Sequence, residues 1–331
     1  MSGQAGVPRV SVVIPTYNHA HLLGRALVSA LTQTFQDVEV IVVDDASEDG
    51  TAEVIARLGD PRLRLLRRSR HEGAARAWNA AIAEARGEWI AFLDSDDEWL
   101  PEKLARQLAC ARNAASVIYC RYYRQNTDGA RALLPTRPLA EGDVLDELLA
   151  RTAVPTTSGY VVRRCALLEV GGFDETLASG QDYNLLLKLA SVSHRFAAVQ
   201  EPLFIKHNHS GRQIRTDAIA KLTGARAIDR HWGPVVRERL GVDAYERWRA
   251  ERLRKVWKVQ RRHVKQLIRS GARRQAWRYG VRMLPYLPWS ARLVAKAAAF
   301  ALLGGRVRPR GVGEPPREQD RNRALGPGWR R

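Results

Sequence analysis

The sequence predicts an α/β protein built on a doubly wound, mostly parallel sheet with helices on both faces. Three observations lead to this fold class. Short runs rich in Val and Ile lack strict polar alternation, which is typical of strands covered on both faces. Segments with helical periodicity separate these runs, and a helix between two strands predicts a right-handed parallel crossover. Polar residues gather directly after the strands, at the sheet edge where such folds bind ligands.

The first hundred residues contain four predicted strands and three predicted helices. The strands are 10–15 (VSVVIP), 38–45 (VEVIVVDD), 62–66 (RLRLL) and 88–94 (EWIAFLD), and the helices lie around 20–34, 50–58 and 74–86. Residues 115–206 mix strand-like pieces at 116–123, 158–164 and 195–204 with a helical segment at 182–190. No GxGxxG follows the first strand and no GxxxxGK[ST] is present, which disfavours a dinucleotide-binding Rossmann domain and a P-loop enzyme.

Length and cysteine content indicate an ordinary globular protein of a reduced compartment. The 331 residues are 45% hydrophobic, enough for one large domain with an extension. The three cysteines have no CxxC spacing, so neither a disulfide framework nor a zinc site is indicated. The first fifteen residues lack the basic and long apolar regions of a secretion signal, and we expect a cytoplasmic protein.

The net charge of +19 lies in the C-terminal third of the chain. Residues 1–220 hold 25 Lys and Arg against 27 Asp and Glu, whereas residues 221–331 hold 29 against 8. We therefore expect three parts: a near-neutral domain over 1–220, a basic helical extension rich in Arg and Trp over 221–305, and a disordered tail over 306–331. The most apolar stretch, 286–305, is interrupted by Pro and basic residues, and we expect it to be interfacial or packed rather than transmembrane.

The basic extension has three possible roles. Its cations and tryptophans could dock on an anionic membrane surface, placing the protein on the inner face of the membrane. The same charge could bind nucleic acid, but no recognisable nucleic-acid module is present, so this role is disfavoured. The helices could also simply pack against the domain with their arginines in water.

Four acids crowd the turn after the fourth predicted strand. Asp97 and Glu98 precede Pro101 and fit the acidic start of a helix. Asp94 does not, because it directly follows the apolar run Ile-Ala-Phe-Leu. Alternate acids at the end of a strand, Asp94 and Asp96, predict a bound cation, and a solvated acidic turn is the alternative.

Four blocks together resemble the family 2 glycosyltransferases, which have the GT-A fold. The blocks are VVIPTYN, VIVVDDASEDGT, ARGEWIAFLDSDDEWLPEKLARQ and VGGFDETLASGQDYNLLLKLA, and the resemblance covers roughly residues 8–215. It implies an inverting enzyme that transfers a sugar from a nucleotide diphosphate donor, with a UDP-sugar favoured. The implied acceptor is a glycan or a lipid-linked glycan, in synthesis of bacterial cell-surface polysaccharide.

The resemblance also assigns the metal and the donor site. It implies that Asp96 ligates Mg²⁺ or Mn²⁺ at the donor diphosphate, where a hard cation neutralises the charge of the leaving group. Asp94 and Ser95 then lie near the ribose. Two histidines follow the last predicted strand, and the resemblance implies a metal or phosphate role for one of them: His209 as a ligand, with His207 on the acceptor side. Solvated loop histidines are the alternative.

The first two strand ends supply the implied nucleotide pocket. Thr16 and Tyr17 would line it, with Pro15 and Asn18 in the same turn; a purely structural turn is the alternative for Asn18. Asp45 would accept a hydrogen bond from the base, while Asp44 braces the loop; capping of the next helix, together with Ser47, is the alternative for either.

One departure from the family pattern concerns the third helix. The family commonly has an Arg-Asn pair where this chain has Trp78-Asn79. The neighbouring Arg76 could supply the missing contact to the nucleotide.

Asp182 is the implied general base. Displacement at the anomeric carbon with inversion requires one base beside the acceptor hydroxyl. The family's preceding Glu is Gln181 here, which retains hydrogen bonding in a supporting role without a charge. Asp182 as a helix N-cap is the alternative. A non-catalytic nucleotide-sugar or glycan binding module is the alternative function, suggested by Gln181 and Trp78 and disfavoured by the presence of Asp45, Asp96 and Asp182 together.

Overall fold

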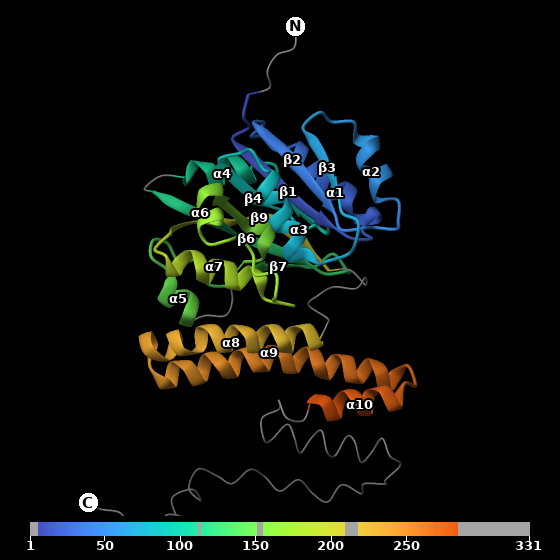
Figure 1. Ribbon diagram of the computed structural model, residues 1–331, viewed down its shortest axis with the longest axis vertical. Helices are drawn as coiled ribbons and strands as arrows, with labels where there is room; N and C mark the ends of the chain where they lie inside the picture. The colour runs from blue at the N-terminus through green and yellow to red at the C-terminus, as the bar shows by residue number, and fades with distance from the viewer. Residues whose placement is uncertain (1–5, 112–113, 151–154, 209–217, 284–331) are drawn as a thin grey trace, which may run out of the picture. The chain divides into compact units, whose positions relative to one another are not determined.

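The computed structural model describes residues 6–111, 114–150, 155–208 and 218–283. The chain forms two compact units, Met1–Gln260 and Arg261–Arg331. The first unit contains a mixed sheet with helices packed on it (Figure 1).

The N-terminal half of the sheet is parallel, as predicted. Its strands are β1 (Val10–Thr16), β2 (Val38–Asp44), β3 (Leu63–Arg67) and β4 (Trp89–Phe92), in the order β3-β2-β1-β4. The connecting helices are α1 (Ala20–Leu31), α2 (Thr51–Leu58) and α3 (Ala74–Glu84). The strand order reverses beside β1, which is where ligands bind in doubly wound sheets.

The second half of the sheet is mixed. β8 (Tyr160–Arg163) runs antiparallel to β4 and to β6 (Ala115–Gln125), and β6 pairs in parallel with β9 (Arg195–His207). Two short strands complete it: β7 (Arg131–Leu134) pairs with β6, and β5 (Asp97–Trp99) pairs with β9, both antiparallel. A single 3-10 turn, η1 (Thr157–Gly159), precedes β8.

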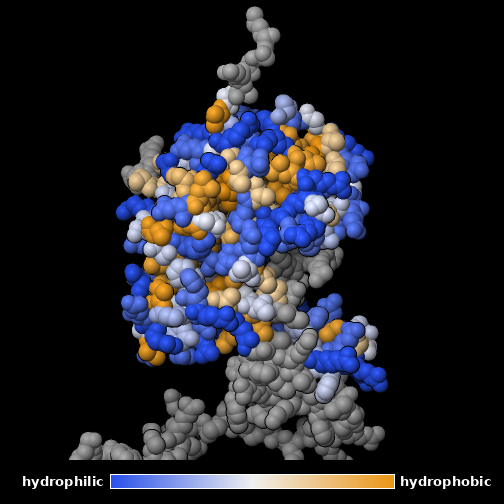
Figure 2. All heavy atoms as spheres, viewed as in Figure 1, coloured by the Kyte–Doolittle hydropathy of each residue, from blue (hydrophilic) through white to orange (hydrophobic). Residues whose placement is uncertain are grey.

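Two hydrophobic clusters cover the two faces of this sheet. Alternate residues of one strand belong to different clusters: Val12 and Ile14 pack with α1, whereas Val13 packs with α3. The same alternation in β2 and β4 explains why their sequences read as continuous apolar runs. On the face seen in Figure 2, hydrophobic side chains are interspersed with hydrophilic ones, as on an ordinary water-exposed surface.

The expected helix start at Asp97 and Glu98 is wrong. These residues belong to β5, and the next helix, α4 (Lys103–Ala109), begins after Pro101. Asp97 is fully buried rather than solvated. Pairing of β5 with β9 sets Asp97 opposite Lys206, which gives the buried carboxylate a counter-ion.

The remaining helices include two that belong to the main core. The helices after α4 in the described ranges are α5 (Leu145–Ala150), α6 (Arg164–Glu169), α7 (Gln181–Ser191), α8 (Ala218–Leu240), α9 (Val242–Arg269) and α10 (Arg273–Met283). Trp232 of α8 and Trp248 of α9 are buried in the cluster that also contains residues of α7. Their indole N–H groups donate to Asn184 Oδ1 (2.9 Å) and to the Tyr183 hydroxyl (3.0 Å).

Trp232 and Trp248 therefore pack α8 and α9 against the core that contains α7. The predicted boundary at residue 220 stays a prediction; the compact unit described here runs to Gln260. The predicted interfacial stretch 286–305 and tail 306–331 lie outside the described residues. Of the helices in the described ranges, none has the length and apolar character needed to cross a membrane.

Candidate active site

The loops after β1 and β2 are joined by hydrogen bonds. Asn18 has a positive φ of 53°, which asparagine tolerates, and its Oδ1 accepts the N–H of Glu48 at 2.8 Å. The Asn18 N–H donates to Ser47 Oγ at 2.9 Å. Asp49 accepts the N–H of Ala20 at the start of α1. Asn18 thus holds the two strand ends together.

Asp44, the last residue of β2, and Asp45, the residue after it, have different hydrogen-bond partners. Asp44 accepts the N–H of Ser47 at 2.9 Å, which braces the turn after β2. Asp45 reaches across to the loop before α3, where it accepts the N–H groups of Glu72 (3.1 Å) and Gly73 (2.7 Å). Asp45 therefore fixes the β3–α3 loop beside the predicted nucleotide pocket.

An aromatic pair stands beside Asp45. The rings of Tyr17 and His71 are stacked, with centroids 3.8 Å apart, and His71 Nδ1 lies 2.8 Å from Asp45 Oδ2. Tyr17 is 38% exposed, so part of its ring is open to a ligand. Thr16 is buried, and its hydroxyl has no hydrogen-bond partner in the described structure. Pro15 lies in β1, paired with Val43 of β2.

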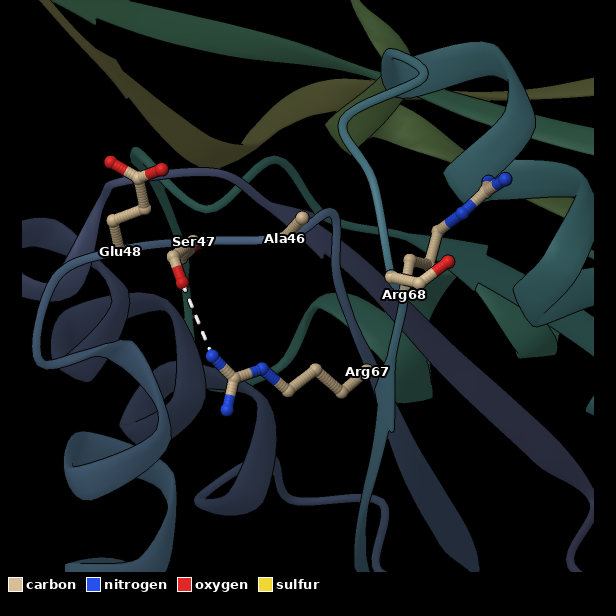
Figure 3. A pocket seen from close by; sticks show the side chains of 6 residues that line it. Ala46, Ser47, Glu48, Arg67 and Arg68 are labelled. Carbon is tan, nitrogen blue, oxygen red and sulfur yellow. Dashed lines mark hydrogen bonds between the residues drawn. The ribbon is translucent and has the colours of Figure 1, made fainter.

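A shallow pocket opens at the ends of β2 and β3 (Figure 3). It is lined by Ala46, Ser47, Glu48, Arg67, Arg68 and Ser69. Arg67 extends under the loop after β2 and donates to the carbonyl oxygen of Ser47 at 3.4 Å. Arg68 points the other way, toward Glu72 and Asp45. The pocket therefore carries charges of both signs, the Arg67 guanidinium and the Glu48 carboxylate.

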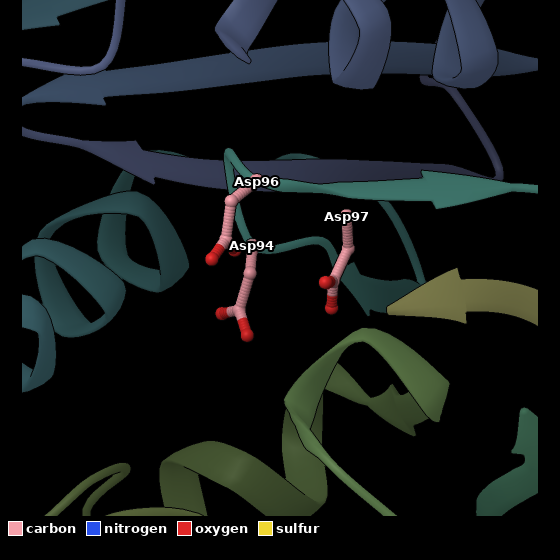
Figure 4. Close-up of side chains that lie close together, drawn as sticks. All are labelled: Asp94, Asp96 and Asp97. Carbon is pink, nitrogen blue, oxygen red and sulfur yellow. The ribbon is translucent and has the colours of Figure 1, made fainter. Parts of the chain in front are cut away.

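The turn between β4 and β5 brings three carboxylates together (Figure 4). One oxygen from each of Asp94, Asp96 and Asp97 lies within 4.8 Å of the others. Carboxylate oxygens are the donors that hard cations such as Mg²⁺ and Mn²⁺ prefer. The donor set of this turn therefore fits the divalent cation that the sequence predicts.

Lys206 of β9 holds two of these three acids. Its Nζ lies 3.4 Å from Asp94 Oδ2 and 3.3 Å from Asp97 Oδ2. The Ser158 hydroxyl donates to Asp97 Oδ2 at 2.6 Å and accepts the N–H of Asp94 at 3.1 Å. Burial and the charges of Asp96 and Asp94 raise the pKa of Asp97 to about 8, whereas Lys206 and Ser158 act in the opposite direction.

Basic residues also contact the acidic turn and the residue after it, Glu98. Arg25 donates to the carbonyl oxygen of Asp96 at 2.8 Å. His19 Nδ1 lies 2.8 Å from Ser95 Oγ, and His207 Nε2 lies 2.9 Å from Glu98 Oε2. Burial lowers the pKa of His207, and the Glu98 carboxylate opposes that effect. His207 thus contacts Glu98 beside the three carboxylates, and His209 lies outside the described residues.

Asp182 stands at the beginning of α7. The N-cap is Gly180, with a φ of 84°, so the predicted alternative of an Asp182 N-cap does not describe this helix start. Asp182 Oδ1 accepts the N–H of Tyr183 at 2.8 Å, and Gln181 Nε2 donates to the Leu177 carbonyl oxygen. Burial raises the pKa of Asp94, with smaller contributions from the charges of Asp96 and Asp182, whereas Lys206 acts in the opposite direction.

Packing explains why α3 has Trp78-Asn79 where the family commonly has Arg-Asn. Trp78 is buried, with its ring against those of Phe92 and Phe173. Asn79 exchanges hydrogen bonds with the backbone of Phe173. Arg76 pairs with two carboxylates, Glu72 at 3.0 Å and Glu175 at 3.4 Å.

Sequence reasoning missed several residues that hold this site. Lys206, Ser158, His71 and Arg68 were not predicted, because each acts through a contact distant in sequence. Lys206 had one available signal, since it lies one residue before the predicted His207 on the same strand. His71 lies in the loop before α3 and Ser158 in the 3-10 turn η1, and neither segment carries a motif of its own.

The fold, together with the family match and the relative that follow, identifies the chain as a glycosyltransferase of the GT-A fold. Residues 11–175 match the family described as Glycosyl transferase family 2. Succinoglycan biosynthesis protein ExoO of Rhizobium meliloti (strain 1021) is 35% identical over 236 residues, which are 66% of this chain and 67% of ExoO. The chain belongs to glycosyl transferase family 2.

A second relative matches a shorter segment of the chain. The Escherichia coli enzyme named UDP-Glc:alpha-D-GlcNAc-diphosphoundecaprenol beta-1,3-glucosyltransferase WfgD is 40% identical over 114 residues. That match covers 34% of this chain and 45% of WfgD, so the chain spans less than half of this relative.

Two solved structures share the fold. S. aureus TarS 1-349 in complex with UDP-GlcNAc has a TM-score of 0.55 and 18% identity, covering 93% of this chain and 98% of that one. Mannosyltransferase PcManGT from Pyrobaculum calidifontis, in complex with GDP-Man and Mn²⁺, has a TM-score of 0.53 and 22% identity, covering 89% and 86%. At these identities the likeness establishes the fold alone.

Proposed function

We propose that the protein is an inverting, metal-dependent glycosyltransferase that uses a nucleotide-diphosphate-sugar donor. The observation that carries this proposal is the arrangement along one sheet edge. Such a reaction requires a nucleotide site, a cation site and a base. For these the chain offers the Tyr17–His71 ring pair beside Asp45, the three clustered carboxylates after β4, and Asp182 at the start of α7.

Each part of the edge has a distinct task in the reaction. Tyr17, Asp45 and the loop around Asn18 hold the base and ribose. Asp96, with Asp94, would hold Mg²⁺ or Mn²⁺, which neutralises charge on the diphosphate when bound. Asp182 accepts the proton of the acceptor hydroxyl while the oxygen forms its bond to the anomeric carbon and the bond to the diphosphate breaks. Inversion requires a base on the face opposite the leaving group, and we assign this task to Asp182.

The choice of donor and metal is supported by the fold neighbours. TarS was solved with UDP-GlcNAc and PcManGT with GDP-Man and Mn²⁺, so this fold accommodates nucleotide sugars, in PcManGT together with a divalent cation. We favour a UDP-sugar for this chain and Mn²⁺ or Mg²⁺ as its metal.

The acceptor is a glycan or a lipid-linked glycan. ExoO is named for succinoglycan biosynthesis, and the printed acceptor of WfgD is a diphosphoundecaprenol-linked sugar. Synthesis of cell-surface polysaccharide on such acceptors takes place where the lipid is, so we place the protein in the cytoplasm at the inner face of the membrane.

Anionic lipid is the partner that the C-terminal helices suit best. Twelve Lys and Arg and no Asp or Glu occur between Arg252 and Met283. In the second compact unit, Ile268 and Trp277 are exposed beside this charge, as in segments that lie at a membrane interface. Nucleic acid stays the disfavoured partner. Packing of the helices without any partner is the alternative, since Trp232 and Trp248 are already buried in the core.

Donor hydrolysis tests the function. The purified chain is incubated with a panel of nucleotide sugars and Mn²⁺, and the release of nucleoside diphosphate is measured with and without EDTA. We expect Mn²⁺-dependent hydrolysis of one UDP-sugar. Binding of a nucleotide sugar without turnover, with or without candidate acceptors, would favour the non-catalytic binding module, and binding of none would overturn the donor site.

A further inference from the structure

We propose that Lys206 is a positioning residue that keeps the free divalent cation off the acidic turn, so that the metal binds together with the donor diphosphate. This inference rests on the proposed function of that turn. It concerns a residue of β9 that no motif of the sequence identified.

The first support is the geometry of the lysine. Antiparallel pairing of β5 with β9 sets Asp97 opposite Lys206. The ammonium lies 3.3 Å and 3.4 Å from the two oxygens of Asp97 and 3.4 Å from Asp94 Oδ2. Of the three clustered carboxylates, the ammonium contacts two directly. It therefore occupies the side of the cluster formed by Asp94 and Asp97.

The second support is burial. The Lys206 side chain is 15% exposed and that of Asp97 is fully buried, so solvent screens this ammonium weakly. Burial of an ammonium costs free energy, and the two carboxylates in contact with it, those of Asp94 and Asp97, offset that cost. The lysine is thus a permanent cation beside the metal ligands.

A permanent cation discriminates between the free metal and its diphosphate complex. A bare dication is repelled by the ammonium, whereas a dication that arrives on a diphosphate has its charge largely cancelled. After the sugar leaves, the diphosphate carries one more negative charge, which the same ammonium stabilises. Lys206 therefore opposes metal binding alone and favours the complex that the reaction produces.

Mn²⁺ affinity tests this role in the full chain at about pH 8. Lys206→Met removes the charge and keeps an unbranched side chain, and Lys206→Arg retains the charge. We expect Lys206→Met to bind Mn²⁺ alone at least about tenfold more tightly than wild type, because the repulsion acts at short range in a poorly screened site. We expect Lys206→Arg to bind as wild type does. A lysine with only a structural role would give the opposite sign, since its loss would loosen the carboxylates.

A second pair of variants covers the case in which Lys206→Met does not fold. Asp97→Asn and the double variant Asp97→Asn/Lys206→Met leave no buried carboxylate unpaired at position 97. We expect the double variant to bind Mn²⁺ about tenfold more tightly than Asp97→Asn. Equal or weaker Mn²⁺ binding on removal of Lys206 in either background overturns the proposal. Failure of the wild-type chain to bind UDP or any other nucleotide with Mn²⁺ would instead overturn the proposed donor site.

Discussion

Tyr17 and His71 stack almost in parallel, with ring centroids 3.8 Å apart and planes inclined by 19°. The histidine covers one face of the tyrosine and is itself held by Asp45. One face of Tyr17 is therefore covered by His71, which sets the orientation of the ring that we propose to contact the nucleotide base.

Tyr17→Ala should weaken UDP binding by about two- to tenfold, since an aromatic contact contributes about 0.5–1.5 kcal/mol beyond its buried area. Tyr17→Phe should bind as wild type does, because it keeps the ring. Calorimetry with UDP and Mn²⁺ measures both variants. Unchanged affinity in Tyr17→Ala would show that the base lies elsewhere.

Asp96→Ala should abolish transfer and remove most of the Mn²⁺-dependent part of nucleotide binding, because it deletes the proposed metal ligand. Stability should change little, since the clustered acids repel one another. UDP titrations with Mn²⁺ and with EDTA measure the effect. Asp128→Ala, in an exposed turn after β6, is the control and should leave binding unchanged. Tight, Mn²⁺-dependent binding by Asp96→Ala would contradict the assignment.

Asp182→Asn should leave donor affinity nearly intact and lower the transfer rate by about 10² or more, the usual scale for loss of a general base. The size of the side chain and its bond to the Tyr183 N–H can be kept by Asn. Calorimetry and transfer rate are measured on the same samples, with Asp174→Asn, whose carboxylate serves a turn before α7, as the control. Undiminished transfer by Asp182→Asn would exclude Asp182 as the base.

Neutralising three exposed cations of the second compact unit should release the protein from anionic vesicles. The variant changes Arg261, Arg262 and Lys265 to Gln. At about 1 kcal/mol for each cation near a charged bilayer, affinity for phosphatidylserine vesicles should fall by at least tenfold. High salt should release the wild type, because exposed charges are screened over about 10 Å at 0.1 M.

The matched control neutralises three exposed arginines of the first unit, Arg9, Arg57 and Arg131. It should pellet with the vesicles as the wild type does. Equal vesicle binding by the two triple variants would contradict docking through the C-terminal helices. Loss of duplex DNA binding without loss of vesicle binding would favour the nucleic-acid role.

The buried Lys103 predicts how the stability of the protein depends on pH. It is fully buried, its Nζ donates to Gln107 Oε1 at 2.6 Å and lies 4.0 Å from the Trp99 ring centroid. Burial lowers its pKa to about 8, with a smaller opposing effect of Cys120. Between this value and the unfolded pKa of about 10.4, the unfolded chain binds more protons, so the contribution of Lys103 to stability rises with pH.

Lys103→Met should therefore be more stable than wild type at pH 7, where the charged lysine is penalised in the folded state alone. The advantage should shrink as pH rises from about 8 to 10, since each unit of pKa shift corresponds to about 1.4 kcal/mol. Urea unfolding of both proteins at several pH values measures the difference. Lys258→Met, at an exposed position, is the control. An advantage that grows with pH would contradict the prediction.

The sequence predicted the parts of the fold that depend on local patterns. Val and Ile runs located β1 to β4 within a few residues, since strands covered on both faces leave such runs. β5 was missed because Asp97-Glu98-Trp99 has no strand pattern, and its pairing depends on β9, more than a hundred residues later. The acidic turn could be predicted because its acids lie next to one another in the sequence. Its partners Lys206 and Ser158 could not, because they come from other strands and turns.

The two indole hydrogen bonds to α7 bear on how this protein could diversify. Trp232 and Trp248 hold the helix that begins with Gln181 and Asp182, so the first part of the C-terminal region supports the geometry of the proposed base. An exchange of C-terminal segments between relatives at residue 220 would separate that helix from its supports. Recombination that preserves activity should instead fall after Gln260, where a new segment could alter cellular targeting without disturbing the chemistry.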